Sequence, residues 1–461
     1  MPSLLEIIIL AAGKGTRMYS HRPKVLQELG GRPLLAHVLA CARALAPAAV
    51  HVVYGHGGER VPQAFPDAGV SWVLQKVQKG TGHAVREAMA HVAKNAMVLV
   101  LYGDVPLIAP DTLRDLVAAA SGDTLALLTV ELPEPGNYGR ILRNAKGAVV
   151  KIVEQKDAGP AERAVREINP GFLVAPAERL LAWLARLGND NVQGEYYLTD
   201  IIEIAVADGL TVATRRPRST WEILGVNSQQ ELAQLERIYQ MQQAEKLMQQ
   251  GVTLRDPARF DLRGELKAGR DVVIDVNVVL EGKVVFGDGV HIGPNNVIRD
   301  ATIGAGTVIQ PNCVIEKSVV GKACRIGPFT RLRPDTRIAD HVHIGNFVEI
   351  KKSEVGEGSK INHLSYIGDT TVGKDVNIGA GTITCNYDGA NKHRTVIGDG
   401  SFIGSNTQLV APVAVGEGAT IGAGSTIVKD TPPGELTLSR AEQKTVQGWK
   451  RPVKKQVRRE E

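Results

Sequence analysis

Most of the C-terminal half repeats one apolar residue followed by positions that are mainly small or polar. A glycine often follows the apolar residue, as in Ile292-Gly293 and Ile326-Gly327, where a chain turning a tight corner favours a residue without Cβ. The pattern predicts a hexapeptide solenoid, in which three hexads make one triangular coil and each inward side chain lies on its counterpart in the next coil. An antiparallel β-sandwich is the alternative, but the period of two and the hairpin turns that it needs are missing. The repeating positions are Ile274, Leu280, Phe286, Ile292, Ile298, Ile303, Ile309, Ile315, Val320, Ile326, Leu332, Ile338, Ile344, Ile350, Val355, Ile361, Ile367, Val372, Ile378, Ile397, Ile403, Leu409, Val415, Ile421 and Ile427.

The repeat has one long interruption, between Ile378 and Ile397. Residues 384–394 break the register and cannot lie flat on a face of the solenoid, so we expect them to form an extruded loop. Insertions on one face of a solenoid tend to build its binding surface. The interruption therefore predicts a ligand site in this half of the chain.

The N-terminal half begins with an apolar run, residues 6–10, followed by a glycine-rich turn. A short run without polar positions is typical of a parallel strand covered on both faces. The turn contains Gly13 and Gly15 and leads to a predicted helix, an arrangement that presents backbone N–H groups to a phosphate, and Arg17 and Lys24 add positive charge. The turn lacks the third glycine of a dinucleotide-binding fingerprint and the ending of a P-loop, so neither assignment is favoured.

A second apolar run, residues 97–101, ends just before Asp104. A carboxylate beyond the C-terminal end of a parallel strand lies where open α/β sheets bind ligands, and Mg²⁺ commonly takes one or two protein oxygens together with substrate phosphate. Asp104 is therefore a candidate magnesium ligand, with a turn or helix-cap aspartate as the alternative. A further glycine loop and four polar segments are each as consistent with turn chemistry as with ligand binding; they are residues 75–84, 137–140, 153–156, 168–171 and 224–227.

Residues 228–250 contain no glycine or proline and place Leu232, Leu235 and Ile238 at helical spacing. We interpret this segment as a linker helix whose Leu and Met stripe is packing surface. The expected domains are an α/β domain over residues 1–228, the linker helix over residues 229–250, and the solenoid with a C-terminal arm over residues 251–461.

Composition adds limits to this picture. The net charge of +5 is modest for 461 residues and favours anionic partners without requiring nucleic acid. The four cysteines lack metal-ligand spacing, so we expect reduced thiols in a cytoplasmic protein; they are Cys41, Cys313, Cys324 and Cys385. The sequence shows no signal peptide and no apolar run long enough to span a membrane.

The first domain resembles the sugar nucleotidyltransferases, which have a Rossmann-like α/β fold and join a sugar 1-phosphate to a nucleoside triphosphate. The resemblance rests on the motif L-A-A-G-x-G-T-R-M at residues 10–18 and the Pro-Lys pair at residues 23–24. It implies that Arg17 and Lys24 stabilise the triphosphate and the leaving pyrophosphate, and that Asp104 and Asn227 hold Mg²⁺. The residues implied to bind UDP-N-acetylglucosamine are Leu10, Ala11, Ala12, Gly13, Lys24, Gln75, Gly80, Thr81, Tyr102, Gly103, Asp104, Gly139, Glu154, Asn169 and Asn227, of which Gln75, Gly80 and Thr81 hold the uracil and Gly139, Glu154 and Asn169 contact the sugar.

The solenoid resembles the left-handed parallel β-helix acyltransferases. With the first domain ahead of it, the whole chain is similar to the bifunctional N-acetylglucosamine-1-phosphate uridyltransferases and glucosamine-1-phosphate acetyltransferases. That family implies acetyl transfer from acetyl-CoA to glucosamine 1-phosphate, then uridylyl transfer from UTP to N-acetylglucosamine 1-phosphate, in a homotrimer. The residues implied to bind acetyl-CoA are Ala380, Asn386, Tyr387, Ser405, Ala423 and Arg440.

Acetyl transfer needs a base, because an ammonium ion has no lone pair with which to attack a thioester. His363 is the candidate, and a solvent-exposed histidine in a coil is the alternative for a single histidine. Four cations recur at spacings near one coil and predict a phosphate-binding strip; they are Arg331, Arg333, Lys351 and Lys352. The resemblance makes His363 the proton acceptor and implies that glucosamine 1-phosphate is bound by Arg333, Lys351, Tyr366 and Asn377.

The repeat stops after Pro433, and we expect a solvated basic tail, in which Trp449 is a candidate anchor over a coil or over the CoA site. The tail cations are Lys450, Arg451, Lys454, Lys455, Arg458 and Arg459. Two other functions fit the same sequence. One is a single-activity nucleotidyltransferase whose solenoid only oligomerises or regulates, and the other is a solenoid scaffold with a nucleotide-sensing domain.

Overall fold

The computed structural model describes residues 4–454 of the chain. It divides into two compact units. The first runs to Lys246 and includes Leu262–Gly264, and the second comprises Leu247–Asp261 and the chain from Glu265 onward. Helix α8, Gln229–Gln249, buries Leu235 in the first unit, whereas Met248 near its end is 38% exposed and is not packing surface.

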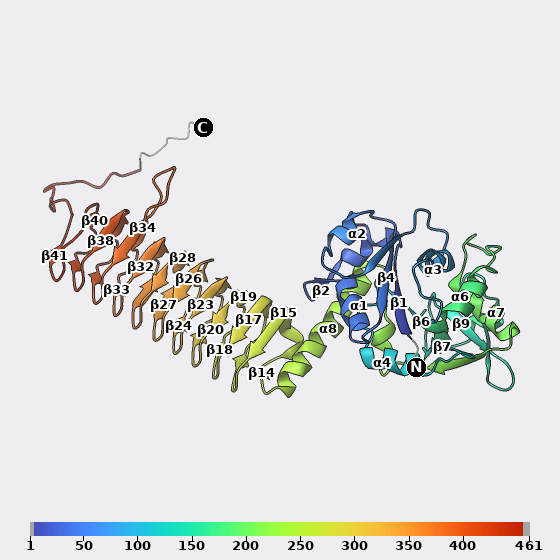
Figure 1. The fold of residues 1–461 in the computed structure, drawn as a ribbon. Coiled ribbons are helices and arrows are strands. Elements are labelled where there is room, and N and C mark those ends of the chain that lie inside the picture. Colours follow the sequence, from blue (N-terminus) through green and yellow to red (C-terminus); the bar gives the residue numbers. More distant parts are fainter. Residues whose placement is uncertain (1–3, 455–461) are drawn as a thin grey trace, which may run out of the picture. The chain divides into compact units, whose positions relative to one another are not determined.

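The first unit is built on a twisted α/β sheet (Figure 1). Its strand order is β13-β7-β12-β6-β1-β4-β5, and all neighbours are parallel except β12, which is antiparallel to both β6 and β7. The predicted Rossmann-like α/β fold is confirmed. The strands are β1 (Leu4–Ala11), β4 (Ala49–Tyr54), β5 (Ser71–Leu74), β6 (Ala96–Tyr102), β7 (Thr124–Leu128), β12 (Leu173–Pro176) and β13 (Thr211–Arg215).

The central strand β1 is apolar except for Glu6 because helices cover both faces of the sheet, and the buried Glu6 carboxylate lies 2.9 Å from His51 Nε2. Ile8 and Leu10 pack in the core beneath α3 (Thr81–Met89), α6 (Ala177–Leu184) and α7 (Ile201–Ala207). Ile7 and Ile9 pack on the other face, beneath α1 (Leu34–Arg43) and α4 (Pro110–Ala118). The remaining elements of this unit are α2 (Arg60–Gln63), α5 (Pro160–Arg163), the hairpin of β2 (Glu28–Leu29) and β3 (Arg32–Pro33), and a second sheet of β8 (Val130–Glu131), β9 (Gly139–Arg143), β10 (Val149–Val153) and β11 (Glu167–Asn169).

The helix expected after the glycine-rich turn is absent from this stretch, and the prediction was wrong. The turn leads instead into two short 3-10 helices, η1 (Thr16–Met18) and η2 (Lys24–Leu26). Gly15 and Tyr19 flank η1 in the left-handed region, at φ 60° and 47°, which stops the helix after one turn. A Cβ on Gly15 would lie 2.8 Å from that of Lys24, so the glycine lets Lys24 lie directly against the turn.

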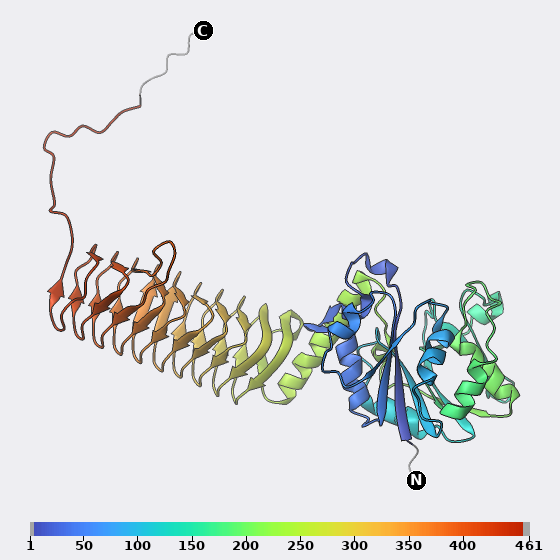
Figure 2. The same ribbon diagram turned by 45° about the horizontal axis from the view of Figure 1, so that its top comes forward.

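The second unit is a stack of parallel coils (Figures 1 and 2). Every residue of the predicted hexad register is at most 3% exposed. Equivalent residues pair from coil to coil, as when Ile309 pairs with Ile292 on one side and with Ile326 on the other. The predicted left-handed parallel β-helix is confirmed.

Within residues 4–454, the coils form two parallel sheets. The first contains β14 (Thr253–Leu254), β16 (Val273–Ile274), β18 (His291–Ile292), β21 (Val308–Ile309), β24 (Arg325–Ile326), β27 (His343–Asn346), β30 (Lys360–His363), β33 (Asn377–Ile378), β36 (Phe402–Ile403), β39 (Thr420–Ile421) and β41 (Leu436–Thr437). The second contains β15 (Phe260–Ala268), β17 (Val278–Phe286), β19 (Val297–Arg299), β20 (Thr302–Ile303), β22 (Val314–Glu316), β23 (Ser318–Val320), β25 (Arg331–Leu332), β26 (Thr336–Ile338), β28 (Glu349–Lys351), β29 (Glu354–Val355), β31 (Tyr366–Gly368), β32 (Thr370–Val372), β34 (Ile383–Cys385), β35 (Thr395–Ile397), β37 (Gln408–Val410), β38 (Val413–Val415) and β40 (Thr426–Ile427).

The interruption of the repeat is shorter than predicted. Thr384 is 1% exposed, pairs with Leu409 of the next coil and occupies the inward position six residues after Ile378. Its hydroxyl is satisfied because Oγ1 accepts a hydrogen bond from the Gly368 N–H at 2.8 Å. The extruded loop therefore comprises residues 386–394, and the prediction began it two residues too early because only aliphatic residues were counted as inward. The loop stands out from the coils in Figure 2.

Candidate active sites

A cavity of about 500 Å³ opens at the carboxyl ends of β1 and β6. The chain passes from β1 to β4 on one side of β1 and later returns to β6 on the other side, so the loops that leave these strands diverge. Such a switch point is where open α/β sheets bind ligands. Residues expected to contact the nucleotide line this cavity; they are Leu10, Ala11, Ala12, Gly13, Lys24, Gln75, Gly80, Thr81, Tyr102 and Asp104.

A second cavity of about 570 Å³ shares Thr81, Tyr102 and Asp104 with the first. It brings together Gly139, Glu154 and Asn169, which are expected to contact the sugar, and Asn227, which is expected to hold the metal. Arg17, which is expected to stabilise the triphosphate, lines the same cavity. Gly103 is the one expected residue of this site that lines neither cavity. Its N–H donates to the Leu10 carbonyl at 2.9 Å, and this hydrogen bond links the carboxyl ends of β1 and β6.

Lys24 links the two expected magnesium ligands. Its Nζ donates to Asp104 Oδ2 and lies 3.2 Å from Asn227 Oδ1. A carboxylate and an amide oxygen thus converge on one positive centre. This donor set fits Mg²⁺, which takes protein oxygens together with substrate phosphate. Asp104 and Asn227 would hold the ion, and Lys24 would then share Asp104 with it.

Glu154 lies on the wall of the second cavity beside a residue that sequence reasoning missed. The Thr199 hydroxyl donates to Glu154 Oε1 at 3.0 Å. Burial raises the pKa of Glu154, the Thr199 hydrogen bond opposes this rise, and the charge of Asp157 adds to it. Thr199 belongs to the 3-10 helix η3 (Leu198–Asp200) and carries no signal in the sequence that separates it from an ordinary helix-start threonine.

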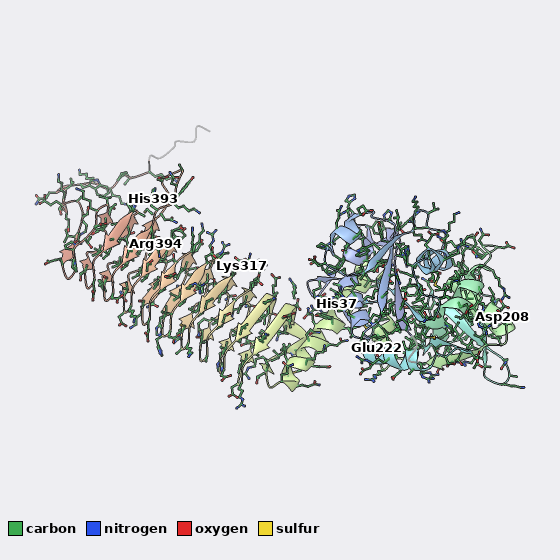
Figure 3. All side chains as sticks on the ribbon, viewed as in Figure 1. His37, Asp208, Glu222, Lys317, His393 and Arg394 are labelled. Carbon is green, nitrogen blue, oxygen red and sulfur yellow. The ribbon has the colours of Figure 1, made fainter. Side chains whose placement is uncertain are left out.

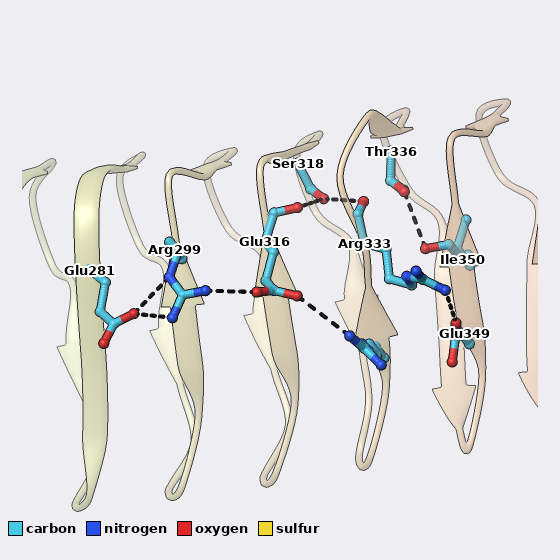
Figure 4. Close-up of polar contacts among 9 residues, drawn as sticks. Glu281, Arg299, Glu316, Ser318, Arg333, Thr336, Glu349 and Ile350 are labelled. Carbon is cyan, nitrogen blue, oxygen red and sulfur yellow. Dashed lines mark hydrogen bonds and ion pairs between the residues drawn. The ribbon is translucent and has the colours of Figure 1, made fainter.

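A ladder of alternating charges leads along the β-helix to the second site. Glu281, Arg299 and Glu316 stack in register on successive coils, and Arg299 forms ion pairs with both carboxylates (Figure 4). The next positions of the same column are Arg333 and Lys351. The alternation thus ends where two cations follow one another, and like charges at neighbouring positions favour a bound anion.

The predicted strip of four cations is only partly present, because carboxylates lie among them. The spacing argument counted cations alone, and acidic residues on neighbouring strands neutralise part of the charge. The ion pairs are Arg331–Glu316 at 3.8 Å, Arg333–Glu349 at 2.8 Å and Lys352–Asp369 at 3.7 Å.

Lys351 keeps a strongly positive environment through Lys392, a second residue that sequence reasoning missed. The neighbouring Lys392 lowers the pKa of Lys351, burial and the charge of Arg333 lower it further, and the charge of Asp369 opposes the shift. Lys392 lies in the extruded loop, so only the fold brings it to Lys351. Arg333, Lys351 and Lys392 thus bring three positive charges together on this face, a set that suits an anion.

A tyrosine hydroxyl and an asparagine amide meet beside Lys351. Gly368 follows Lys351 in the column, and a Cβ added there would lie 2.5 Å from Tyr366 Oη and 2.8 Å from Asn386 Nδ2. The glycine therefore leaves the space in which these two polar groups lie. Asn386 is held from behind by a hydrogen bond to Asp369 Oδ2 at 2.5 Å.

His363 is exposed at the corner after β30, and its ring is oriented by Asn346 of the previous coil. Nδ1 lies 2.9 Å from Asn346 Oδ1. An amide oxygen only accepts, so Nδ1 carries a proton, and in the neutral ring Nε2 then presents its lone pair. This is the state that a general base needs. His363 and Asn346 border a cavity of about 210 Å³.

The corner that carries His363 continues through residues expected to bind acetyl-CoA. Ala380, Ser405 and Ala423 occupy equivalent corner positions on the coils that follow. The side chain of Arg440 lies over Gly422 and Gly424, where an added Cβ would meet it at 3.7–3.8 Å. These residues therefore form one continuous edge that begins at His363.

The expected residues of the second site divide between the two sheets of the β-helix. His363 and Asn377 belong to the neighbouring strands β30 and β33 of the eleven-stranded sheet, whereas Lys351 and Tyr366 belong to the other sheet. Tyr387 is 60% exposed in the loop and donates its hydroxyl to the Gly389 carbonyl at 2.6 Å. The fold of one chain thus gathers only part of the expected substrate set on one face.

The loop that carries Tyr387 is ordered by Asp388. Oδ1 accepts from the N–H groups of Ala390 and Asn391, and Oδ2 lies 2.7 Å from His393 Nε2. Figure 3 labels His393 and Arg394 of this loop. The hydrogen bonds from Asn391, His393 and Ala390 hold the pKa of Asp388 well below its usual range. The carboxylate therefore stays charged and keeps the loop closed on itself.

Family models match both halves of the chain. A MobA-like NTP transferase domain matches residues 7–251, the GMPPB C-terminal domain matches residues 262–336, and six bacterial transferase hexapeptide repeats match residues 394–429. The bifunctional protein GlmU of Aromatoleum aromaticum is 60% identical over 453 residues, which cover 98% of this chain and 100% of the relative. The GlmU proteins of Thiobacillus denitrificans and Nitrosospira multiformis are 61% and 58% identical, again over 98% of this chain and 98% and 99% of theirs.

The chain belongs to the bifunctional GlmU family. It is a transferase that acts on small molecules, with an NTP transferase half and a hexapeptide transferase half. Membership in the family supports the two predicted activities, uridylyl transfer and acetyl transfer, and implies the use of a nucleotide and an acyl-CoA. Within residues 4–454, none of the helices combines the length and the hydrophobicity that a membrane span requires.

The C-terminal arm of this GlmU-family chain does not bear out the anchor suggested for Trp449, which is 67% exposed. Lys450, Arg451 and Lys454 are exposed as well. The other cations of the predicted basic tail, Lys455, Arg458 and Arg459, lie outside the described residues.

Proposed function

We propose that this GlmU-family enzyme makes UDP-N-acetylglucosamine in two steps at two separate sites. The solenoid transfers acetyl from acetyl-CoA to glucosamine 1-phosphate, and the first domain then joins the product to UTP. One observation carries the proposal: an oriented histidine base begins the corner that carries Ala380 and Ser405, on a chain whose other unit has a cavity of about 500 Å³ with converging oxygens.

In the first step His363 Nε2 takes a proton from the ammonium group of glucosamine 1-phosphate, which leaves a neutral amine. The freed nitrogen attacks the thioester carbonyl, the C–S bond breaks, and CoA leaves as a thiolate that takes up a proton. Arg333 and Lys351 bind the sugar phosphate, with Tyr366 and Asn377 on the sugar. Ala380, Asn386, Tyr387, Ser405, Ala423 and Arg440 bind acetyl-CoA in this proposal.

In the second step a phosphate oxygen of N-acetylglucosamine 1-phosphate attacks the α-phosphorus of UTP, and pyrophosphate leaves. The catalysis is mainly positioning and charge neutralisation. Arg17 and Lys24 neutralise the triphosphate, and Asp104 and Asn227 hold Mg²⁺, which when bound neutralises phosphate oxygens. Glu154 accepts from a sugar hydroxyl beside Gly139 and Asn169, and Gln75, Gly80 and Thr81 hold the base.

We also propose a homotrimer, as the family resemblance implies. The separation of Asn377 from Lys351 and Tyr366 supports it, because a neighbouring chain that presents the opposite face would complete the substrate set. Light scattering of the purified protein tests the trimer. The first reaction uses acetyl-CoA and the second uses UTP, and we retain the expectation of a cytoplasmic protein. We also retain the expected domain boundaries. The uridyltransferase domain is residues 1–228, the linker helix is residues 229–250, and the acetyltransferase domain with its C-terminal arm is residues 251–461.

The test is a pair of release assays on the purified protein. Acetyl-CoA and glucosamine 1-phosphate should yield free CoA thiol, and UTP with N-acetylglucosamine 1-phosphate should yield pyrophosphate only when Mg²⁺ is present. Pyrophosphate release without CoA release would leave a single-activity nucleotidyltransferase. If neither CoA nor pyrophosphate is released, the scaffold with a nucleotide-sensing domain is the remaining function and the proposal is wrong.

A further inference from the structure

The amide of Gln75 has a fixed orientation in the nucleotide cavity. The side chain is 3% exposed, and its Nε2 lies 3.2 Å from the Gly80 carbonyl oxygen and 2.9 Å from His83 Nδ1. A carbonyl oxygen only accepts hydrogen bonds, so the group that faces Gly80 must be the NH₂ end of the amide. Oε1 therefore points the other way.

That oxygen is presented to the cavity. Among residues 4–454 no hydrogen bond holds Gln75 Oε1, and the side chain lines the cavity of about 500 Å³. An acceptor there suits a pyrimidine with an N–H at its pairing edge, such as N3–H of uracil. It repels cytosine, whose N3 carries a lone pair at the same place. The orientation of this one amide thus decides between two bases.

His83 completes the orientation, because it accepts the second N–H of the Gln75 amide. Nδ1 can accept only when the ring is neutral and carries its proton on Nε2. Nε2 lies 3.3 Å from Glu87 Oε1, one turn later on α3, so a carboxylate favours the proton at that nitrogen. Burial lowers the pKa of His83, Glu87 opposes the shift, and Arg86 and Lys79 add to it. The ring is therefore neutral near pH 7.

We propose that His83 is a positioning residue for base selection, which holds the Gln75 amide with its oxygen toward the base. Without His83, Gly80 still holds one N–H, but the second N–H loses its acceptor and the amide gains freedom to turn. This inference rests on the proposed function, which assigns a uridine nucleotide to the cavity.

The experiment compares pyrophosphate release from UTP and from CTP in the full-length enzyme with N-acetylglucosamine 1-phosphate and Mg²⁺. His83→Leu should lower the ratio of kcat/KM for UTP to that for CTP about tenfold, which is the worth of one hydrogen bond. His83→Asn is the matched control, because its side-chain oxygen lies near the place of Nδ1 and can accept from Gln75. It should keep most of the preference for UTP.

A purely structural histidine would lower both kcat/KM values by the same factor and leave the ratio unchanged, and that result would overturn the proposal. Equal loss of preference in the Leu and Asn variants would overturn it as well. Far-UV circular dichroism and thermal unfolding of the same preparations check that the first unit of each variant is folded. Failure of the wild-type enzyme to use UTP would count against the proposed function and not against the role of His83.

Discussion

At the level of single residues, the neighbours of a reactive group decide its state. The Asn346 side-chain oxygen accepts from His363 Nδ1 and so keeps a proton on that nitrogen. Lys24 forms an ion pair with Asp104. Neither Asn346 nor the contact of Lys24 with Asp104 follows from a motif, because the partners are far apart in the sequence. Two predictions test these contacts.

Replacing Asn346 by Leu removes the acceptor that orients His363. The ring can then turn or change tautomer, so kcat for CoA release should fall about tenfold, the worth of one hydrogen bond, with little change in KM for glucosamine 1-phosphate. Asn346→Asp keeps an oxygen at the same place and should retain most of the rate. Pyrophosphate release should not change in either variant. Full acetyl transfer in Asn346→Leu would show that His363 needs no orientation.

Replacing Lys24 by Met should separate metal binding from catalysis. The Lys24 ammonium competes with Mg²⁺ for Asp104 Oδ2, so its removal should tighten Mg²⁺ binding in the absence of nucleotide by about tenfold, measured by titration calorimetry. Pyrophosphate release should nevertheless fall by about a hundredfold or more, because the triphosphate loses a cation. Arg22→Met removes a nearby surface cation and should change neither quantity. Unchanged Mg²⁺ affinity in Lys24→Met would mean that the lysine and the ion do not compete.

At the level of elements, the column of inward hexad residues decides the fold of the second unit. Thr384 shows that this column can accept a polar side chain. This residue occupies an aliphatic position, yet its hydroxyl accepts from Gly368 N–H at 2.8 Å. The coil can therefore carry one polar side chain at its core just before the loop begins.

Replacing Thr384 by Val restores the aliphatic pattern but should destabilise the β-helix. The Gly368 N–H would lose its partner inside the coil, which costs about 1–3 kcal/mol in the free energy of unfolding. Thr384→Ser keeps the hydroxyl and should lose less. Denaturant unfolding of both variants measures the difference. A Val variant as stable as the wild type would contradict the role given to this hydroxyl.

The hexad register and the two buried strands were predictable, because each rests on a local period of apolar residues. The limits of the loop were not, because Thr384 looks polar in a sequence and is satisfied only by a residue of the previous coil. The prediction of a helix after the turn that follows β1 was wrong for a similar reason. Gly15 and Tyr19 adopt left-handed backbone conformations, which no period of apolar residues reveals.

Site residues with a family motif were easy to name, whereas their partners were not. Thr199, Asn346 and Lys392 each act through a contact that only the fold creates. The predicted cationic strip failed in part because Glu316, Glu349 and Asp369 come from neighbouring strands. Pairing across coils was therefore the information that the sequence reasoning lacked.

At the level of the whole molecule, each compact unit carries its own candidate site. The reactions that we propose for them are consecutive, since the acetylated sugar phosphate made by the second unit is the substrate of the first. We propose that no residue of one site is needed for the chemistry of the other. A variant that lacks one activity should therefore keep the other.

The most direct test mixes two such variants, His363→Ala and Asp104→Ala, and measures UDP-N-acetylglucosamine formed from glucosamine 1-phosphate, acetyl-CoA, UTP and Mg²⁺. Neither variant alone should make the product, because each lacks one step. The mixture should make it, because the intermediate released by Asp104→Ala is used by His363→Ala. Product from either variant alone, or none from the mixture, would contradict two independent sites on one chain.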